Sequence, residues 1–439
     1  MEQYSFLFDL DATITKVEIL PTIAQVIGKQ DEMRELTERT MKGEVPFAES
    51  FMKRVEILGV IPVSRVSEIV RDIPVHEELC AWIREHKDRC YVVTGNLDIW
   101  IGALMERLGI EKDHVFCSHA EVENDKIAGL TEICDKGKVL EDFPHPFVAV
   151  GDGDNDAGMV GAADIGIGFG AVRDVAYSVL NNADYAIYTE NKLCRLLKEI
   201  ASKTCAEGQA EAACCDKAEG FGAPGSKTIV ISCAGMGTRL GIGTTKALID
   251  VDGKPLIIRQ LELLKDFEDV RIVVGYQAER VISLVNEYRR DVLYVFNHNY
   301  KGTGTGASFK LGCRYAGELV VALDGDLLVH PDDLRAVLTS DKELVGGCTP
   351  STDNPVLIHA EEDSEGRKMI VYFSRESGEY EWTGLAQIRR DRLPEGTGHV
   401  YQLLEPLIPL EMIEIRTKEI DTMADYEHAV NWIRNGYHD

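Results

Sequence analysis

Short apolar runs recur along the chain, and each of them stops at a polar or glycine-rich turn. Such runs are typical of buried parallel strands. They lie at residues 4–9, 90–93, 147–150, 228–233, 270–274, 293–296 and 319–323. Stretches with helical spacing separate them. The alternation predicts α/β folds whose functional sites lie at the carboxyl ends of the strands.

Two segments depart from this alternation. Residues 14–76 contain amphipathic helical patterns, such as the one at 31–41, and directly follow the first strand. We expect them to form a helical cap over the end of that strand. Residues 204–226 are rich in Ala, Gly and Glu with little apolar periodicity, which is typical of a linker. The sequence therefore predicts one domain at 1–203 and a second at 227–439.

Composition narrows the possible partners and the compartment. The 439 residues carry 74 Asp and Glu against 47 Lys and Arg, a formal net charge of −27, which disfavours binding to nucleic acid or anionic lipid. No signal peptide or run of about 18 apolar residues is visible. The eleven cysteines are scattered, so we expect a cytoplasmic protein with reduced thiols. Adjacent Cys214 and Cys215 could bind a soft metal, but no partner cluster lies nearby.

The first strand ends in two aspartates, Asp9 and Asp11. A carboxylate can attack phosphorus when Mg²⁺ screens the charges, and a second carboxylate can protonate the leaving oxygen. The pair alone could equally be turn-forming residues. Three later features favour phosphoryl chemistry: a hydroxyl and a small residue at 94–95, Lys136, and an acidic loop at 151–156 suited to Mg²⁺.

These motifs, in this order, resemble the haloacid dehalogenase (HAD) superfamily of phosphatases, and the 14–76 insert resembles the cap of phosphoserine phosphatases. The resemblance implies a Rossmann-like domain with a helical cap, and hydrolysis through an aspartyl-phosphate on Asp9. Asp11 would be the general acid/base and would offer its backbone carbonyl to Mg²⁺. The remaining matched residues would bind the metal (Asp9, Asp152, supported by Asp156), the phosphoryl group (Thr94, Gly95, Lys136, Asn155) and the substrate from the cap (Glu18, Met41, Phe47, Arg54).

Two points leave the substrate open. In the family, the cap glutamate binds the amino group of the substrate and the cap arginine its carboxylate, but Glu18 and Arg54 could also form solvated salt bridges. Asn96 stands where phosphoserine phosphatases usually carry a second glycine. Phosphoserine is therefore the leading candidate among phosphomonoesters.

A second constellation follows the strand at 228–233. Gly235 and Gly237 allow the backbone to approach phosphate oxygens, and a following helix would present free N–H groups. Dinucleotide binding is a rival interpretation, but such a site would want an acid about 20 residues on. Arg239 and Lys246 instead supply two cations, which suit a triphosphate whose α-phosphoryl group is transferred.

Carboxylates for a second Mg²⁺ site lie farther along the chain. Asp324 and Asp326 end a strand, and the run 419–422 supplies Asp421 near the C-terminus. Each of them alone could be an ordinary loop residue. Together with the phosphate loop, they favour metal binding.

The second half resembles GT-A-like sugar-phosphate nucleotidyltransferases. Like the short members of that family, it lacks an added C-terminal β-helix. Among them it is most similar to the cytidylyltransferases that act on phosphocholine and related phosphorylated alcohols or phosphonates. The resemblance implies catalytic roles for Arg239 and Lys246, and Mg²⁺ on Asp324, Asp326 and Asp421. The implied nucleotide-binding residues are Ala234, Gly235, Met236, Gly237, Thr238, Arg239, Lys246, Gly304 and Thr305.

Three features depart from that family or leave its substrates open. Thr245 replaces the usual proline before the catalytic lysine, and Ser232-Cys233 replaces a common Ala-Ala. The Gly-Thr-Gly loop at 302–308 resembles the second nucleotide loop of the family. It is as reminiscent of uridylyltransferases as of cytidylyltransferases, which leaves CTP and UTP open. Trp382 could line a pocket for an organic cation or pack in the core.

The sequence thus predicts a bifunctional, Mg²⁺-dependent enzyme acting on small phosphorylated metabolites and a nucleoside triphosphate. One half would hydrolyse a phosphoserine-like monoester. The other would transfer a nucleotidyl group to a small phosphorylated alcohol or phosphonate and release pyrophosphate. The alternative is a phosphoserine phosphatase with a non-catalytic, nucleotide-binding C-terminal module.

Overall fold

The chain forms two compact units, Met1–Ala212 and Ala213–Asp439, and each is described by itself. The computed structural model describes residues 3–41, 44–206, 226–237, 243–352 and 354–438. Most of the expected linker at 204–226, including Cys214 and Cys215, therefore lies outside the described residues. Helix α10 (Glu190–Ala206) extends three residues into that expected linker.

The N-terminal unit is built on a parallel sheet in the order β7-β6-β5-β1-β2-β3, with β4 antiparallel to β3 at the edge. The strands are β1 (Ser5–Phe8), β2 (Cys90–Leu97), β3 (Val115–Glu123), β4 (Lys126–Glu132), β5 (Phe147–Gly151), β6 (Ile165–Phe169) and β7 (Tyr185–Ile187). Phe8 of β1 pairs with Val92 of β2 and with Val150 of β5. The residues that follow these pairs, among them Asp9 and Asp152, consequently emerge at one edge of the sheet.

Strand β2 is longer than its apolar run. The apolar letters end at Val93, but the strand continues to Leu97. Thr94, Gly95 and Asn96 therefore lie within a strand rather than after it, at an irregularity where the register of β2 against β3 shifts between Val93 and Leu97.

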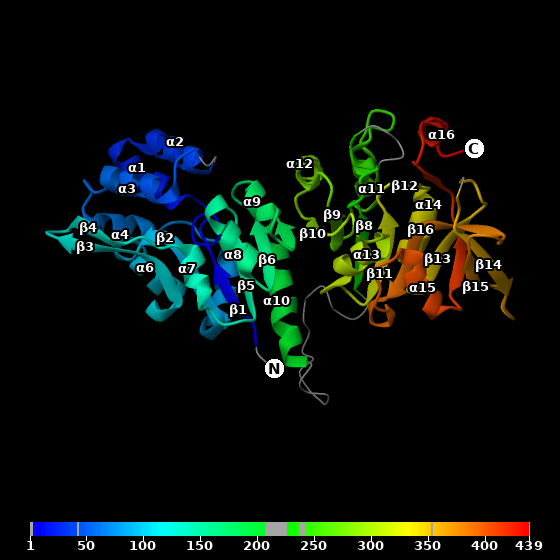
Figure 1. Cartoon of the computed structure of the whole chain (residues 1–439), viewed down its shortest axis with the longest axis horizontal. Coiled ribbons are helices and arrows are strands. Elements are labelled where there is room, and N and C mark those ends of the chain that lie inside the picture. The colour runs from blue at the N-terminus through cyan, green and yellow to red at the C-terminus, as the bar shows by residue number, and fades with distance from the viewer. Residues whose placement is uncertain (1–2, 42–43, 207–225, 238–242, 353, 439) are drawn as a thin grey trace. The chain divides into compact units, whose positions relative to one another are not determined.

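Helices cover the sheet of the N-terminal unit (Figure 1). They are α1 (Ile19–Ala24), α2 (Gln30–Met41), α3 (Phe47–Leu58), α4 (Val63–Arg71), α5 (Glu77–Glu85), α6 (Asp98–Leu108), α7 (Lys136–Glu141), α8 (Ala157–Ala162), α9 (Tyr177–Leu180) and α10.

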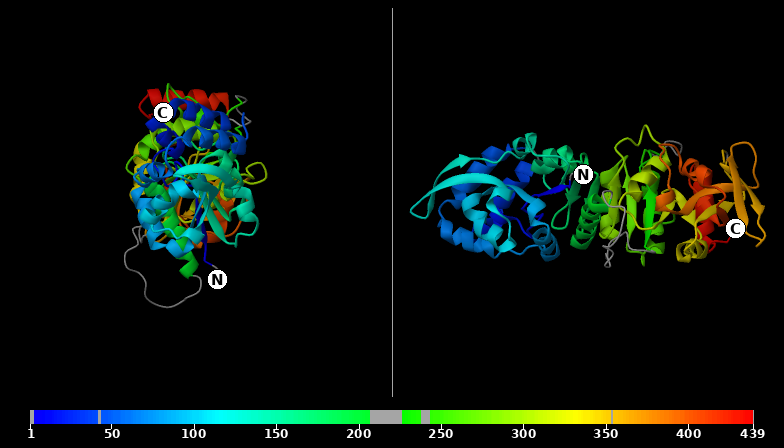
Figure 2. Two further views of the ribbon diagram at one scale, coloured as in Figure 1. Left: turned by 90° about the vertical axis from the view of Figure 1, so that its left-hand side faces the viewer. Right: turned by 90° about the horizontal axis from the view of Figure 1, so that it is seen from below.

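The segment expected to be a cap contains the four helices α1–α4. Its entry and exit are joined by an isolated bridge between Thr15 and Val75. The β3–β4 hairpin projects from the unit (Figure 2), and Asp125 at its tip accepts hydrogen bonds from the backbone N–H (2.8 Å) and hydroxyl (2.6 Å) of Ser64 in α4. The hairpin thus fixes the start of α4.

The C-terminal unit contains a parallel set of strands in the order β10-β9-β8-β11. They are β8 (Lys227–Ser232), β9 (Val270–Val274), β10 (Leu293–Phe296) and β11 (Leu319–Asp324). Antiparallel strands extend the sheet beyond β11, namely β13 (Leu344–Cys348), β14 (Leu357–Glu362), β15 (Lys368–Ser374) and β16 (Tyr380–Arg389), with β17 (Glu411–Glu414) parallel to β13. A separate pair joins β12 (Leu327–Val329) to β18 (Thr417–Glu419).

Helices pack around this sheet, and the core beneath them includes one satisfied buried charge. The helices are α11 (Leu256–Leu263), α12 (Ala278–Tyr288), α13 (Thr305–Cys313), α14 (Pro331–Thr339), α15 (Val400–Leu404) and α16 (Met423–Arg434). Arg271 of β9 is fully buried and pairs with Asp269 through two 3.0 Å contacts. Its other N–H groups donate to backbone carbonyls, including that of Gly312 at 3.0 Å. This arginine is therefore structural, because its donors are occupied by the protein itself.

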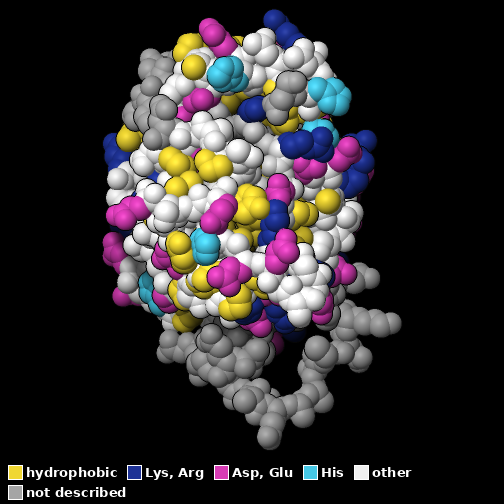
Figure 3. Space-filling model, turned by 90° about the vertical axis from the view of Figure 1, so that its right-hand side faces the viewer, with side chains coloured by type: hydrophobic (Ala, Val, Ile, Leu, Met, Phe, Trp, Pro, Cys, Tyr) yellow, Lys and Arg dark blue, Asp and Glu magenta, His cyan; other side chains and the backbone are white. Residues whose placement is uncertain are grey.

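Acidic and basic side chains are interspersed on the face that Figure 3 shows. The cysteines of the described part of the chain are free and mostly buried. None of the helices in the described ranges combines the length and apolar character needed to cross a membrane.

Candidate active sites

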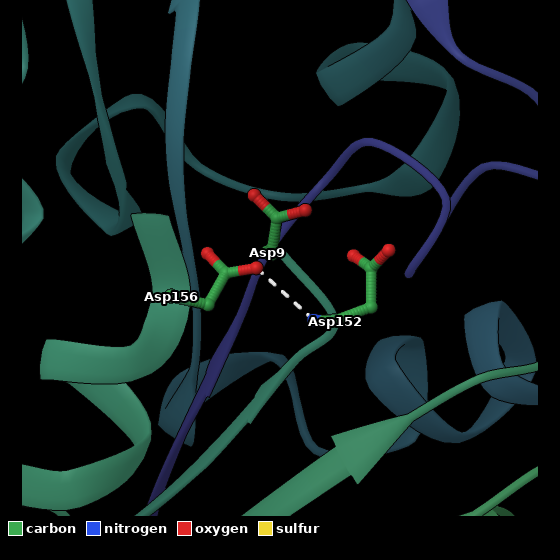
Figure 4. Close-up of side chains that lie close together, drawn as sticks. All are labelled: Asp9, Asp152 and Asp156. Carbon is green, nitrogen blue, oxygen red and sulfur yellow. Dashed lines mark hydrogen bonds between the residues drawn. The ribbon is translucent and has the colours of Figure 1, made fainter. Parts of the chain in front are cut away.

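Three buried carboxylates meet at the edge of the N-terminal sheet. Asp9 follows β1, Asp152 follows β5, and Asp156 lies in the 3-10 turn η4 (Asp154–Asp156); these residues are 4% exposed or less. One ligand atom from each lies within 4.8 Å of the others, as Figure 4 shows. Carboxylate oxygens in this arrangement could hold a hard divalent cation.

Lys136, the first residue of α7, joins two of these carboxylates. Its Nζ atom donates to Asp9 Oδ1 and, at 2.6 Å, to Asp156 Oδ1. The other oxygen of Asp156 accepts hydrogen bonds from the backbone N–H groups of Asp152 (3.0 Å) and Gly153 (2.9 Å). Both oxygens of Asp156 are thus used within the protein, which suits a supporting role.

The electrostatics of this cluster favour an added cation. Burial raises the pKa of Asp152 to about 7, and Asp156 adds to this effect while Arg173 opposes it. Burial and then Asp156 raise the pKa of Asp9 well above its usual range, opposed by Lys136. Burial alone would lower the pKa of Lys136, but Asp156 and Asp9 outweigh it and raise that pKa, so the lysine stays charged.

Asp11 lies beside this cluster and is held by two donors. Its Oδ1 accepts from the backbone N–H of Ile19 at 2.7 Å, and its Oδ2 accepts from the Asn96 side-chain amide. Burial raises the pKa of Asp11, although both hydrogen bonds lower it. A carboxyl group that is buried but still hydrogen-bonded can exist in both protonation states, as a general acid/base requires.

A cavity of about 70 Å³ separates the carboxylates from the cap. The predicted residues Asp9, Asp11, Glu18, Arg54, Gly95 and Asn155 line it, together with Leu20, Thr37, Thr40, Phe51, Asn96 and Arg173, to which the sequence analysis assigned no site role. Thr94 is fully buried beneath the site. The side chains of Met41 and Phe47 lie outside what the structure describes.

Arg173 connects the cap to the cluster formed by Asp9, Asp152 and Asp156. Its guanidinium donates to Glu18 Oε1 and to Asp152 Oδ2. The residue lies in an irregular segment between β6 and α9, 155 positions from Glu18. No local pattern could have revealed this contact, because it depends on the folding of distant segments.

In the C-terminal unit, Lys246 holds two carboxylates. It opens the 3-10 turn η6 (Lys246–Leu248) and donates from Nζ to Asp326 Oδ2 at 2.7 Å and to Asp421 Oδ1. Burial lowers the pKa of Lys246, but Asp326 and Asp421 more than offset this and raise it above its ordinary value. The lysine is therefore a fixed positive charge.

Glu419 completes a second candidate metal site with Asp326 and Asp421. The ligand atoms of these three half-buried side chains lie within 4.8 Å of one another. Burial raises the pKa of Glu419 to about 8, and Asp326 and Asp421 contribute to the shift. Glu419 precedes Asp421 by two positions, and this spacing is the signal that could have placed it in the ligand set.

Asp324, which the sequence analysis included among the metal ligands, does not belong to this three-residue group. Its Oδ1 atom is buried, and burial raises its pKa to about 8, followed by the charge of Asp326. It faces Gly384, where a Cβ atom would lie 2.6 Å from Asp324 Oδ2. Glycine at this position thus makes room for the aspartate.

The expected phosphate loop borders a cavity of about 200 Å³ that Gly235, Gly237, Lys246 and Asp326 help to line. Gly237 has φ of 59°, and a Cβ atom there would lie 3.0 Å from Lys246 Cγ. Ala234 is buried, whereas Met236 is exposed. Thr238 and Arg239 lie outside the described residues.

The second expected nucleotide loop packs against another loop of the same unit. Gly304 N–H donates to the carbonyl of Thr397 at 2.9 Å, and a Cβ atom on Gly304 would lie 2.4 Å from the carbonyl oxygen of Gly398. Thr305 Oγ1 accepts from the N–H of Val400 at 3.3 Å. Gly304 and Thr305 are not among the residues that line the cavity beside Lys246.

Trp382 is half-buried in β16. Its ring meets that of Phe373 edge-on, with 6.4 Å between ring centroids. The indole of Trp382 therefore packs against at least one aromatic side chain of its own unit.

Comparison with known proteins separates the two units in the same way. Residues 6–160 match the haloacid dehalogenase-like hydrolase family, and residues 229–379 match the MobA-like NTP transferase domain family. A phosphoserine phosphatase of Archaeoglobus fulgidus is 33% identical over 193 residues, which are 40% of this chain and 56% of that protein. A phosphoserine phosphatase of Methanocaldococcus jannaschii is also 33% identical, over 37% of this chain and 83% of its own length.

Solved structures resemble the second half as well. The CTP:phosphocholine cytidylyltransferase from Streptococcus pneumoniae is 20% identical, with a TM-score of 0.38 over 47% of this chain and 99% of its own. The chain spans just over half the length of the Archaeoglobus relative. The predicted fold class, a HAD Rossmann-like domain joined to a nucleotidyltransferase domain, is confirmed. The chain belongs through its N-terminal unit to the haloacid dehalogenase-like hydrolases, where it is similar to phosphoserine phosphatases, and its C-terminal unit is a MobA-like NTP transferase domain.

Proposed function

We propose that the chain is a bifunctional enzyme, with a phosphomonoesterase in the N-terminal unit and a nucleotidyltransferase in the C-terminal unit. The observation that carries the proposal is that each unit gathers three carboxylates around a lysine. These are Asp9, Asp152 and Asp156 with Lys136, and Asp326, Glu419 and Asp421 with Lys246. Neighbouring carboxylates repel one another and one lysine does not balance three of them, so such clusters are typical of sites that use a divalent cation on phosphate.

In the phosphatase, Asp9 is the proposed nucleophile and Asp11 the general acid/base. Asp9 attacks phosphorus and forms an aspartyl-phosphate, while Asp11 protonates the departing alkoxide and later deprotonates the attacking water. Lys136 donates to Asp9 Oδ1, and Oδ2 is the proposed attacking oxygen. Mg²⁺, when bound at Asp9 and Asp152, would screen the charge between carboxylate and phosphate. The proposed phosphatase domain comprises residues 1–203, and the proposed nucleotidyltransferase domain comprises residues 227–439.

In the transferase, Lys246 is the proposed contact to the triphosphate, with Arg239 as its partner. This half-buried cation stabilises the charge that develops on the α-phosphoryl group when an acceptor phosphate or phosphonate oxygen attacks and pyrophosphate leaves. Asp326, Asp421 and Glu419 would hold Mg²⁺. CTP is the proposed donor, with UTP as the competing one, and a small phosphorylated alcohol or phosphonate is the proposed acceptor.

Metal binding at the first cluster should be visible in thermal stability. Mg²⁺ at about 100 times its Kd should add about 2.7 kcal/mol to the free energy of unfolding, or about 5–10 °C in Tm for a unit of this size. Asp152→Asn should remove the part of this shift that belongs to the N-terminal unit. Asp72→Asn, a change at a side chain that is 68% exposed, should keep it. Equal shifts in both variants, measured by scanning calorimetry, would contradict the role of Asp152.

The substrates are tested with a panel. The full chain is incubated with Mg²⁺, each nucleoside triphosphate and a set of phosphorylated alcohols, and phosphate and pyrophosphate are assayed separately. We expect phosphate release from O-phosphoserine, and pyrophosphate release with CTP in at least one pairing. Phosphate release without pyrophosphate in any pairing would instead favour a phosphatase with a non-catalytic, nucleotide-binding module.

A further inference from the structure

A second cavity reaches the phosphatase site from the side. It has a volume of about 440 Å³, and we call it the side cavity. Gly95 and Asn155, two of the residues proposed to bind the phosphoryl group, line both the side cavity and the cavity between the carboxylates and the cap. The two cavities therefore meet where the phosphoryl group of a substrate would lie.

The two cavities offer different groups to a bound phosphomonoester. Asp11, the proposed proton donor for the leaving oxygen, lines the cavity at the cap and not the side cavity, and so does Glu18. Lys136, a proposed ligand of the phosphoryl group, lines the side cavity and not the cavity at the cap. The leaving group of a substrate would thus face the cap, and its phosphoryl end would face the side cavity.

The lining of the side cavity runs from the surface to this phosphoryl end. Ala48 in α3 and Lys138 in α7 are exposed, whereas Lys136 is 6% exposed and donates from Nζ to Asp9 Oδ1. Ala48 belongs to the cap, and Lys138 belongs to the part of the unit that carries the sheet. A charge placed at either position is therefore next to the same path from solvent to the nucleophile.

The charges along this path favour an incoming anion at one residue. The chain as a whole has a formal net charge of −27, which repels phosphate dianions unless the approach is locally compensated. Lys136 is engaged by two carboxylates of the catalytic cluster. Lys138 has no ion-pair partner among the described residues. Asp135 also lines the side cavity, but its Oδ1 accepts from the Gly137 N–H at 3.0 Å.

We propose that the side cavity is the approach by which phosphomonoesters and inorganic phosphate reach the phosphatase site, and that Lys138 guides these anions into it. This inference rests on the proposed phosphatase function. Lys138 touches no reacting group in this role, and its charge raises the local concentration of the anion. Its contribution should appear in kcat/KM and in inhibition by inorganic phosphate, and should weaken as salt screens the charge.

The first test varies the charge at position 138. Phosphate release from O-phosphoserine, and its inhibition by inorganic phosphate, are measured at ionic strengths of about 0.01 M and about 1 M. At the lower one, kcat/KM should fall about threefold for Lys138→Gln and about tenfold for Lys138→Glu, and inorganic phosphate should inhibit more weakly by similar factors. At about 1 M both variants should agree with the wild type within about twofold. An unchanged kcat would verify that the N-terminal unit is folded.

Lys112→Glu is the matched control for the loss of one exposed lysine. Lys112 lies in the turn η3 (Lys112–His114) directly before β3, at the end of the parallel sheet opposite to Asp9 and Asp152. The substitution makes the same change in net charge as Lys138→Glu. It should leave kcat/KM within about twofold of the wild type at both ionic strengths.

The second test supplies the missing charge from the cap. Ala48→Lys, added to Lys138→Gln, places a cation at another residue that lines the side cavity. It should restore kcat/KM at low ionic strength to within about twofold of the wild type, because the attraction depends on charge and distance rather than on one particular side chain. Ala48→Gln in the same background adds bulk without charge and should not restore it.

Three results would overturn the inference. If the Lys138 and Lys112 variants lost kcat/KM equally, the effect would belong to the overall charge of the chain. If Ala48→Lys failed to restore kcat/KM, the side cavity would not be the approach. If kcat fell in the Lys138 variants, Lys138 would act on the reacting groups or on the fold. Failure of the wild-type chain to release phosphate from any monoester would instead overturn the phosphatase function itself.

Discussion

Replacing Asp9 with asparagine is expected to abolish phosphate release, by on the order of 10⁴-fold or more, while pyrophosphate release continues at the wild-type rate. An amide oxygen is a poor nucleophile, so the aspartyl-phosphate cannot form. The change preserves shape and an acceptor for Lys136, which also keeps its 2.6 Å bond to Asp156. The measurement is phosphate release from O-phosphoserine and pyrophosphate release with CTP, in the same preparation.

The matched control for this variant is Asp72→Asn, which makes the same chemical change at an exposed ion pair with Arg71. It should leave both activities unchanged. Phosphate release by Asp9→Asn at the rate of the control would show that another residue is the nucleophile. Loss of both activities in Asp9→Asn would show that the two sites are not independent.

Replacing Lys246 with glutamine should impair nucleotidyl transfer and leave the phosphatase activity intact. We expect pyrophosphate release to fall by about 10²–10³-fold, because the neutral side chain no longer stabilises charge on the α-phosphoryl group. The two carboxylates that Lys246 now bridges, Asp326 and Asp421, would also lose their neutralising partner. Phosphate release should be unchanged, and the measurement is steady-state kinetics with the nucleotide and acceptor found in the panel.

Lys254→Gln provides the control for this second change. Lys254 lies eight residues away in sequence, is partly exposed, and pairs with Glu262 at 2.5 Å rather than with the carboxylate cluster. It should retain nucleotidyl transfer within about twofold. If Lys246→Gln retained it equally well, Lys246 would not be a catalytic residue.

The sequence predicts the ends of the buried parallel strands well except for β2, because such strands leave continuous apolar runs that stop where the chain turns. Asp9, Asp152 and Asp326 follow such runs, and sheet pairing brings the first two together. Lys136 is expected from its motif alone. The structure shows its contacts: Lys136 forms ion pairs with both Asp9 and Asp156.

What the sequence could not show depends on contacts between distant segments. Arg173 reaches Glu18 and Asp152 from an irregular segment. The contacts of Asn96 with Asp11 and Thr94 depend on which atoms its amide faces, and a sequence letter does not carry that information. The exposed hairpin at 115–132 was also not expected, because strands open to solvent lack the continuous apolar run by which the buried strands were found.

The central claim is that one chain carries two separate phosphate-transferring sites. The most direct measurement assays phosphate release and pyrophosphate release side by side for the wild-type chain, Asp9→Asn and Lys246→Gln. The account predicts that the wild type performs both reactions, that Asp9→Asn loses only the first and that Lys246→Gln loses only the second. If either single change removed both activities, or if neither change removed any, the assignment of two independent sites would be wrong.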